Sequence, residues 1–104
     1  MYLCQWHIDI PSGKQKEVVD LMKKWDEMMA AVPGLPKVIN QRLMVGHIGV
    51  SPSHIINEYE VASLSDWEAF MKEVGTGRYH QYSEAIAKYI APGSQHWVVY
   101  RLAQ

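Results

Sequence analysis

The order of predicted secondary-structure elements constrains this chain most, because a unit of strand, helix and strand occurs twice. In residues 1–10, apolar side chains recur at every second position, which is typical of a strand with one buried face. Further strands are predicted over about residues 38–46, 54–62 and 94–102, separated by segments that contain glycine and proline. The two middle strands are expected to form a hairpin.

Each predicted helix carries a start signal and an apolar face. Ser12 with Gln15, and Ser65 with Glu68, have the spacing of a capping box. The first helix is expected to end at Pro33, and a Gly-Thr-Gly segment at residues 75–77 interrupts the second helical stretch. The apolar stripe of the first helix is Val18, Met22, Trp25, Met29 and Val32, and its predicted solvated face is Lys16, Glu17, Lys23, Lys24, Asp26 and Glu27.

This order predicts an α+β fold of the ferredoxin-like βαββαβ type, as a single domain over residues 1–104. Its four-stranded antiparallel sheet would carry two helices on one face and leave the other face open. For the second strand, either Ile39, Gln41, Leu43 and Val45 or Asn40, Arg42 and Met44 would lie on the open face. Glu60 is expected to pair with Arg101. From the other strands, the predicted open face comprises Leu3, Gln5, His7, Asp9, His54, Ile56, Glu58, Glu60, Trp97, Val99 and Arg101.

Charge and composition exclude several classes of partner. Ten basic and eleven acidic residues give a formal net charge of -1, so no strong field would attract nucleic acid or an anionic membrane. The single cysteine, Cys4, lies on the apolar face of the first strand and is expected to be a buried hydrophobe. No segment has the roughly 18 apolar residues that a membrane span needs. A cytoplasmic protein is therefore expected.

Several segments resemble the dimeric α/β-barrel superfamily. They are the Pro-Ser-Gly turn at residues 11–13, the Val-Pro-Gly-Leu-Pro segment at 32–36, and Asn-Glu-Tyr-Glu-Val-Ala-Ser at 57–63. The resemblance implies a homodimer in which two open sheet faces meet to form a barrel. It also implies that small ligands bind between each sheet and its own helices or loops. The superfamily includes antibiotic-biosynthesis, quinol and heme-degrading monooxygenases, polyketide cyclases and muconolactone isomerases, so the fold alone does not choose the chemistry.

His7 is the predicted catalytic base. Gln5 and Asp9 flank it on the same strand face, and Glu58 or Glu60 is expected to lie opposite, where a carboxylate would orient the imidazole and raise its basicity. Gln5 and Glu58 are the other predicted catalytic residues. The alternative interpretation is that these side chains merely satisfy one another at a subunit interface. His47, His54 and His96 are expected to be structural.

A second set of residues is predicted to bind substrate, because it lies near the helix interruption or on apolar faces. The set is His80, Tyr79, Trp67, Trp97 and Met22. Heme-degrading members of the superfamily suggest heme as an alternative cofactor, but Trp67 and His80 are too far apart and the first-strand asparagine is absent. A divalent metal at His7 with Glu58 or Glu60 is a further alternative. The favoured prediction has no cofactor.

The sequence therefore favours a homodimeric, cofactor-independent, monooxygenase-like enzyme for an apolar or aromatic substrate of the phenol or quinol type. Its histidine base would sit on the polar face of the first strand and reach a pocket between sheet and helices. A redox-neutral cyclase, isomerase or lyase on the same scaffold is one alternative. A non-catalytic dimeric ligand-binding or stress-response protein is the other.

Overall fold

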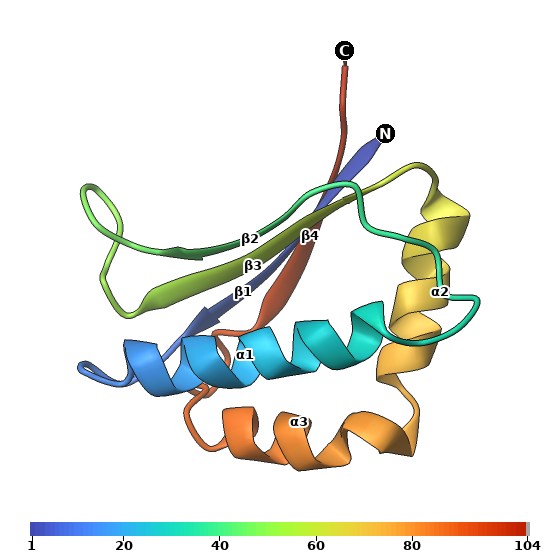
Figure 1. Cartoon of the computed structure of the whole chain (residues 1–104). Helices are drawn as coiled ribbons and strands as arrows, with labels where there is room; N and C mark the ends of the chain where they lie inside the picture. The colour runs from blue at the N-terminus through green and yellow to red at the C-terminus, as the bar shows by residue number, and fades with distance from the viewer. Residues whose placement is uncertain (104) are drawn as a thin grey trace.

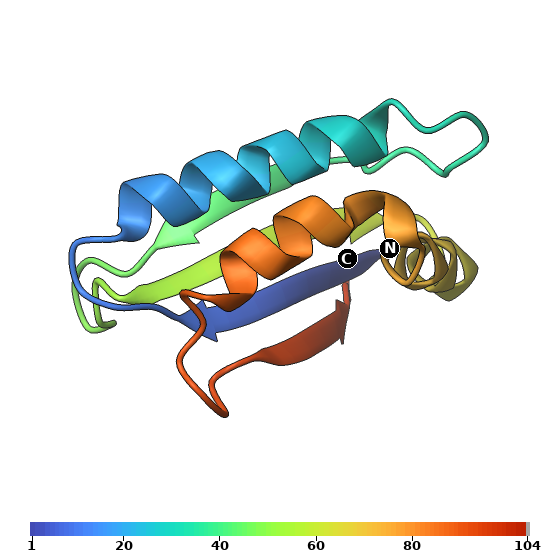
Figure 2. The same cartoon turned by 90° about the horizontal axis from the view of Figure 1, so that it is seen from below.

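The computed structural model describes residues 1–103, so Gln104 of the predicted domain lies outside the described residues. Four strands form one antiparallel sheet in the order β2-β3-β1-β4. The three helices gather on one side of this sheet, with α1 and α3 running beneath it and α2 at one end (Figures 1 and 2). The elements are β1 (Tyr2–Asp9), α1 (Gln15–Ala30), β2 (Gln41–Val45), β3 (His54–Val61), α2 (Leu64–Val74), a 3-10 turn η1 (Gly77–Tyr79), α3 (His80–Ala87) and β4 (His96–Arg101). This confirms the predicted ferredoxin-like α+β fold.

The helix starts differ from the predicted capping boxes. α1 begins at Gln15 after Lys14, and no side chain caps it. α2 is capped by Ser63 instead of Ser65, because the Ser63 side chain accepts a hydrogen bond from the Asp66 backbone N–H at 3.2 Å. The predicted interruption after α2 is confirmed, since α2 ends at Val74 and α3 starts at His80.

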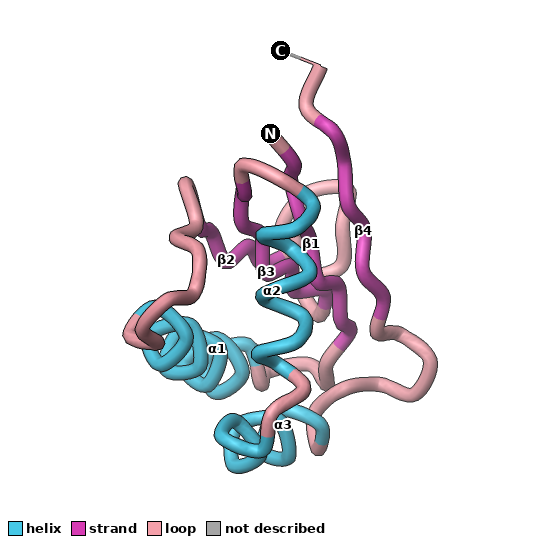
Figure 3. Tube along the Cα trace, turned by 90° about the vertical axis from the view of Figure 1, so that its right-hand side faces the viewer, coloured by secondary structure: helices cyan, strands magenta, loops and turns pink. Residues whose placement is uncertain are grey.

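The core lies between the helices and the sheet, in two neighbouring clusters. One cluster comprises Ile8, Ile10, Val18, Met22, Ile55 and Ile86, and the other Cys4, Tyr59, Val61 and Phe70. Cys4 is fully buried, and this burial raises the pKa of its thiol to about 11. It is therefore the buried hydrophobe that the sequence predicts. Figure 3 shows the helices on one side of the strands, with the other side of the sheet uncovered.

The structure corrects the predicted faces of one edge strand, β4, and decides between the two alternatives for the other edge strand, β2. β4 places Trp97 opposite Trp6 and His96 opposite His7, so Trp97, Val99 and Arg101 share the helix side and His96, Val98 and Tyr100 the open side. The prediction for β4 was therefore wrong by one residue, which exchanges the two faces of a strand. In β2, Arg42 lies opposite Glu58 and Met44 opposite Ile56, so the set with Arg42 joins the open face.

The expected Glu60–Arg101 ion pair is also wrong. Glu60 lies opposite Leu3 on the open face and accepts a hydrogen bond from Asn40 at 3.4 Å, whereas Arg101 pairs with Tyr2 on the helix side.

None of the helices within residues 1–103 has the length and apolar character that a membrane span requires.

Candidate functional site

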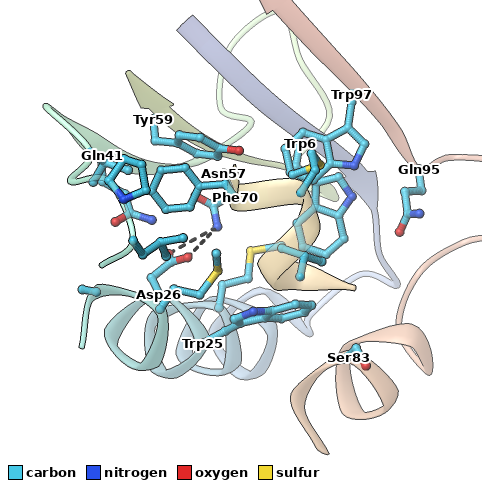
Figure 4. Close-up of a pocket in the computed structure, with 18 of the residues that line it drawn as sticks. Trp6, Trp25, Asp26, Gln41, Asn57, Tyr59, Phe70, Ser83, Gln95 and Trp97 are labelled. Atoms are coloured by element: carbon cyan, nitrogen blue, oxygen red, sulfur yellow. Dashed lines mark hydrogen bonds between the residues drawn. The ribbon is translucent and has the colours of Figure 1, made fainter. Parts of the chain in front are cut away.

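A cavity of about 740 Å³ lies between the sheet and the helices. Its walls come from all four strands, from α1, α2 and α3, and from the loop after α1, so every layer of the fold contributes (Figure 4). The volume is in the range that binds small organic molecules. Five aromatic side chains and three methionines contribute to the wall: Trp6, Trp25, Tyr59, Phe70, Trp97, Met22, Met29 and Met71.

The aromatic wall is a packed arrangement of rings. The Trp6 ring stacks on Trp97 at 6.0 Å with an interplanar angle of 16°, and meets Trp25 edge-on at 6.1 Å. Tyr59 and Phe70 pack against each other with centroids 5.4 Å apart. Flat, rigid rings of this kind favour planar apolar ligands, because such ligands can stack at little cost in conformational entropy.

A polar pair, Asp26 of α1 and Asn57 of β3, interrupts this apolar wall. Asn57 Nδ2 donates to both carboxylate oxygens of Asp26, at 3.2 Å each, and Figure 4 shows the two side chains pointing toward one another. Asn57 is only 9% exposed, and its Oδ1 has no hydrogen-bond partner among the described residues. The pair therefore keeps unused hydrogen-bonding capacity inside the cavity.

Burial makes Asp26 unusually basic for a carboxylate. Withdrawal from water raises its pKa from 3.8 to about 6, and hydrogen bonds from Asn57 and Gln41 oppose part of that rise. Tyr59, on the same wall, has its pKa raised by burial, with smaller contributions from Cys4 and Asp26, so its hydroxyl stays protonated. Asp26 is therefore a group that can accept or return a proton near neutral pH.

Neither member of this pair was among the predicted site residues, although each carries a signal in the sequence. Asp26 was assigned to the solvated face of the first helix, yet it lies four residues after Met22 and three before Met29, within the apolar stripe. Asn57 alternates with the buried Ile55 and Tyr59, so it belongs to the helix side of β3. Two polar residues on apolar faces that pack together are expected to pair with each other.

The mouth of the cavity is more polar and more exposed. His80 Nε2 lies 3.0 Å from Glu84 Oε1, and their side chains are 70% and 65% exposed. Ser83 and Gln95 also line this side of the cavity. Charges there face water, in contrast with Asp26.

The predicted catalytic residues form a separate cluster on the open face of the sheet. Gln5 Nε2 donates to Glu58 Oε1 at 2.8 Å, and Gln5 Oε1 lies 2.8 Å from His7 Nε2. His7 Nδ1 is 2.8 Å from His54 Nε2, and His54 Nδ1 is 2.7 Å from Asp9 Oδ1. We call these five residues the open-face network.

The hydrogen-bond partners in the open-face network constrain the tautomer of His7. Gln5 Oε1 only accepts, so His7 Nε2 must carry a proton, and a neutral His7 then accepts at Nδ1. His54 Nε2 then donates to His7 Nδ1, and His54 Nδ1 lies beside the carboxylate of Asp9. Burial and the neighbouring His96 and His54 lower the pKa of His7, which agrees with a neutral His7.

Two neighbours extend the open-face network. Arg42 of β2 donates from Nε to Glu58 Oε2 at 2.7 Å and forms an ion pair with it, so the buried carboxylate of Glu58 is compensated. On the other side, the His96 ring of β4 stacks on His7 at 4.6 Å with an interplanar angle of 14°. His54 and His96 were expected to be structural, and both contact His7.

The sheet separates the two predicted parts of the site. Gln5, His7 and Glu58 do meet, as predicted, but on the face opposite the cavity, so the expectation that they supply acid–base groups to a pocket under the helices is wrong in its geometry. Alternation along β1 and β3 causes this, because Trp6 and Asn57 point into the cavity while their neighbours point away.

The predicted substrate-binding residues are divided in a similar way. Met22, Trp97 and His80 line the cavity. Tyr79 is 1% exposed and stacks behind Trp25 at 5.9 Å, and Trp67 packs against the Cys4 and Phe70 cluster, so both support the wall from outside. Trp67 and His80 therefore do not meet in the cavity as the heme alternative needs.

The divalent-metal alternative finds no geometric support. In the described part of the chain, no three His, Cys, Asp or Glu side chains are arranged to hold a metal ion. The polar atoms of His7 and Glu58 are instead engaged by Gln5, His54 and Arg42.

Comparison with known proteins identifies the fold. No protein-family model matches the chain, and no curated protein sequence matches it. Solved structures do match. A protein from Nitrosomonas europaea, provisionally named an antibiotic biosynthesis monooxygenase, has a TM-score of 0.73 at 14% identity, with 100% of each chain covered. A NIPSNAP family protein from Agrobacterium tumefaciens has a TM-score of 0.70 at 23% identity, covering 96% of this chain and 90% of that one.

A third match is a variant of SnoaB, a cofactor-independent oxygenase from Streptomyces nogalater. Its TM-score is 0.66 at 10% identity, covering 99% of this chain and 93% of SnoaB. The chain thus has the fold of antibiotic biosynthesis monooxygenase-like proteins, which confirms the resemblance at the level of fold. A shared fold at these identities does not assign a reaction.

Proposed function

We propose that this protein is a cofactor-independent, monooxygenase-like enzyme that oxidises a planar aromatic substrate of the phenol or quinol type. The observation that carries the proposal is the cavity, which is lined by stacked aromatic rings and contains one withdrawn carboxylate, Asp26. Such a cavity suits a flat apolar molecule with a hydroxyl group. The fold shared with a cofactor-independent oxygenase is supporting analogy.

In the proposed reaction the substrate supplies the electrons. A phenol that has lost its hydroxyl proton is electron-rich enough to reduce dioxygen, and one oxygen atom then joins the ring while the other leaves as water. For a simple phenol the balance is phenol plus dioxygen giving para-quinone plus water. The chain contributes binding, exclusion of bulk water and the movement of protons.

The direct test is oxygen uptake by the purified protein with a panel of alkylphenols and hydroquinones. We expect uptake in proportion to quinone formed, without added flavin, heme or metal and in the presence of a chelator. A blank without protein measures spontaneous oxidation. Quinone formation that needs an added cofactor would refute the cofactor-independent mechanism.

The same cavity also suits a redox-neutral cyclase, isomerase or lyase, because a carboxyl group with a pKa of about 6 can both accept and return a proton. Conversion of a substrate under anaerobic conditions would favour this alternative. Tight binding of phenols with no conversion at all would favour a binding protein instead.

We also propose that a second copy of the chain covers the open face. The open-face network there is internally paired, and apolar side chains lie around it, namely Leu3, Met44, Ile56, Val98 and Tyr100. This composition suits a subunit interface, because burial of the apolar side chains is favourable and the polar groups beside them are already hydrogen-bonded to one another. Analytical ultracentrifugation should show a dimer at micromolar concentrations, and a monomer would refute this assembly.

Substitution of His7 by alanine separates the two faces. If the reaction takes place in the cavity, His7→Ala should weaken the dimer and leave phenol binding and turnover in the remaining dimer unchanged. A loss of turnover without any change in assembly would restore His7 as the catalytic base.

A further inference from the structure

We propose that Asp26 is the catalytic base of the cavity, that Asn57 positions it, and that the group it recognises is a neutral aromatic hydroxyl. This inference rests on the proposed function and extends it to particular residues. It replaces the base that the sequence predicted on the opposite face of the sheet.

The location of ionisable groups around the cavity selects Asp26. Lys37, His80 and Glu84 line the cavity but are exposed to water, where their charges are screened. Tyr59 is buried but keeps its own proton, so it cannot serve as the base at neutral pH. Asp26 alone among the lining residues combines withdrawal from water with a proton affinity suited to exchange near neutral pH.

Asn57 holds the carboxylate in one orientation. It lies near the centre of the sheet, opposite Trp6 of β1 and Leu43 of β2, so its backbone is fixed on both sides. Its Nδ2 contacts both carboxylate oxygens at 3.2 Å, and together with the hydrogen bond from Gln41 this still leaves carboxylate lone pairs for a ligand. Because these hydrogen bonds favour the charged form, Asn57 lowers the pKa of Asp26 and opposes part of the effect of burial.

Asp26 has no cationic partner among residues 1–103 and is set among aromatic rings, so it favours a neutral donor over an anionic ligand. A phenol hydroxyl can donate to Asp26 while its ring lies against the aromatic wall. A phenolate or carboxylate ligand would instead place two negative charges together in a site of low polarity, which is strongly unfavourable.

The proton step follows from this geometry. The O–H bond of the substrate breaks, a new O–H bond forms on a carboxylate oxygen of Asp26, and the electron pair stays on the substrate oxygen. Dioxygen then takes up electrons from the substrate anion and bonds to a ring carbon as a peroxide, which accepts the proton from Asp26. Asp26 next removes the hydrogen on that ring carbon as a proton while the O–O bond breaks. The departing hydroxide takes that proton and leaves as water.

The first test is the pH dependence of kcat/KM for oxygen uptake. The wild-type value should rise with pH through about 6 and then level off. Asp26→Asn should lower it by roughly 100-fold or more and remove the rise. Asp20→Asn, on the exposed side of the same helix, is the matched control and should leave the profile unchanged. Equal activity of wild type and Asp26→Asn would overturn the inference.

The second test concerns the positioning role of Asn57. Asn57→Ala removes the hydrogen bonds that favour the charged carboxylate, so the rise should move to higher pH and kcat should fall more than KM increases. A purely structural role would lower activity at every pH without shifting the profile. An unshifted profile in Asn57→Ala would therefore refute the positioning role.

The third test does not depend on turnover. Binding of 4-propylphenol, which stays neutral to about pH 10 like a tyrosine side chain, can be followed by tryptophan fluorescence, because Trp6 and Trp25 line the cavity. Wild-type affinity should rise about tenfold between acidic and neutral pH as Asp26 ionises, since a charged acceptor makes the stronger hydrogen bond. In Asp26→Asn the affinity should not change with pH.

The three tests separate this inference from the proposed function. If phenol binding depends on Asp26 as described but no phenol is oxidised, the oxygenase function is wrong while Asp26 remains the hydroxyl acceptor. If phenols are oxidised but Asp26→Asn retains the wild-type pH profiles of binding and turnover, the function stands and the inference is wrong.

Discussion

Replacement of Asp26 by asparagine should make the protein more stable at neutral pH. The folded state raises the pKa of this carboxyl from 3.8 to about 6, so it binds the proton more tightly than the unfolded chain does. As pH rises from about 4 to 6, the unfolded state ionises first and the free energy of unfolding falls. A shift of this size corresponds to at most about 3 kcal/mol lost above pH 6. Asparagine has nearly the same shape and no charge, so the variant avoids this loss.

The assay is urea denaturation of wild type and Asp26→Asn across this pH range, at one protein concentration because assembly also affects stability. The free energy of unfolding of the variant should increase relative to that of the wild type between about pH 4 and pH 6, and the difference should stay constant above pH 6. Asp20→Asn is the control in the opposite direction, because the neighbouring Lys16 lowers the pKa of the exposed Asp20. If the difference between Asp26→Asn and wild type does not depend on pH, Asp26 is not held in the environment described.

Three further predictions concern the core, the hairpin and the open-face network. Ile86→Ala removes a fully buried side chain and should lower the free energy of unfolding by about 2–5 kcal/mol, whereas Ile48→Ala, at a position 87% exposed, should change it little in the same denaturation assay. Gly46→Ala places a methyl group against the carbonyl oxygen of Ser51 and should lower the melting temperature, whereas Gly77→Ala enters open space and should not. Gln5→Leu leaves His7 Nε2 without its acceptor and should lower the free energy of unfolding by roughly 1–3 kcal/mol. The affinity for 4-propylphenol should nevertheless stay at the wild-type value, because the cavity is on the other face and Arg42 still holds Glu58 in register.

Local patterns in the sequence were sufficient to predict most of the fold. The alternation in β1 correctly placed Gln5 and His7 on the open face, because one full set of apolar side chains marks the buried side. β4 has no such contrast, since both of its faces carry an aromatic and an aliphatic side chain. Its register depends on a tertiary contact, the stacking of Trp97 on Trp6, which no local pattern records.

The candidate site was harder to predict because it depends on which polar residues become buried. Asp26 and Asn57 are ordinary in their local sequence, and their pairing joins α1 to β3 across the core. Each could have been noticed as a polar residue on an apolar face. The cavity that both residues line could not have been predicted, because its shape depends on how the helices pack against the sheet.

Alternation in β3 links the cavity to the open-face network. Asn57 points to Asp26, and the next residue, Glu58, points the other way to Gln5 and Arg42. A slip of β3 by one residue would place the buried charge of Glu58 in the aromatic cavity and move Asn57 away from Asp26, which is costly on both counts. Bonds to Glu58 from both neighbouring strands therefore fix the register that holds Asn57 in place. This gives the open-face network a role in building the site, although the side chains of its five residues lie on the other side of the sheet.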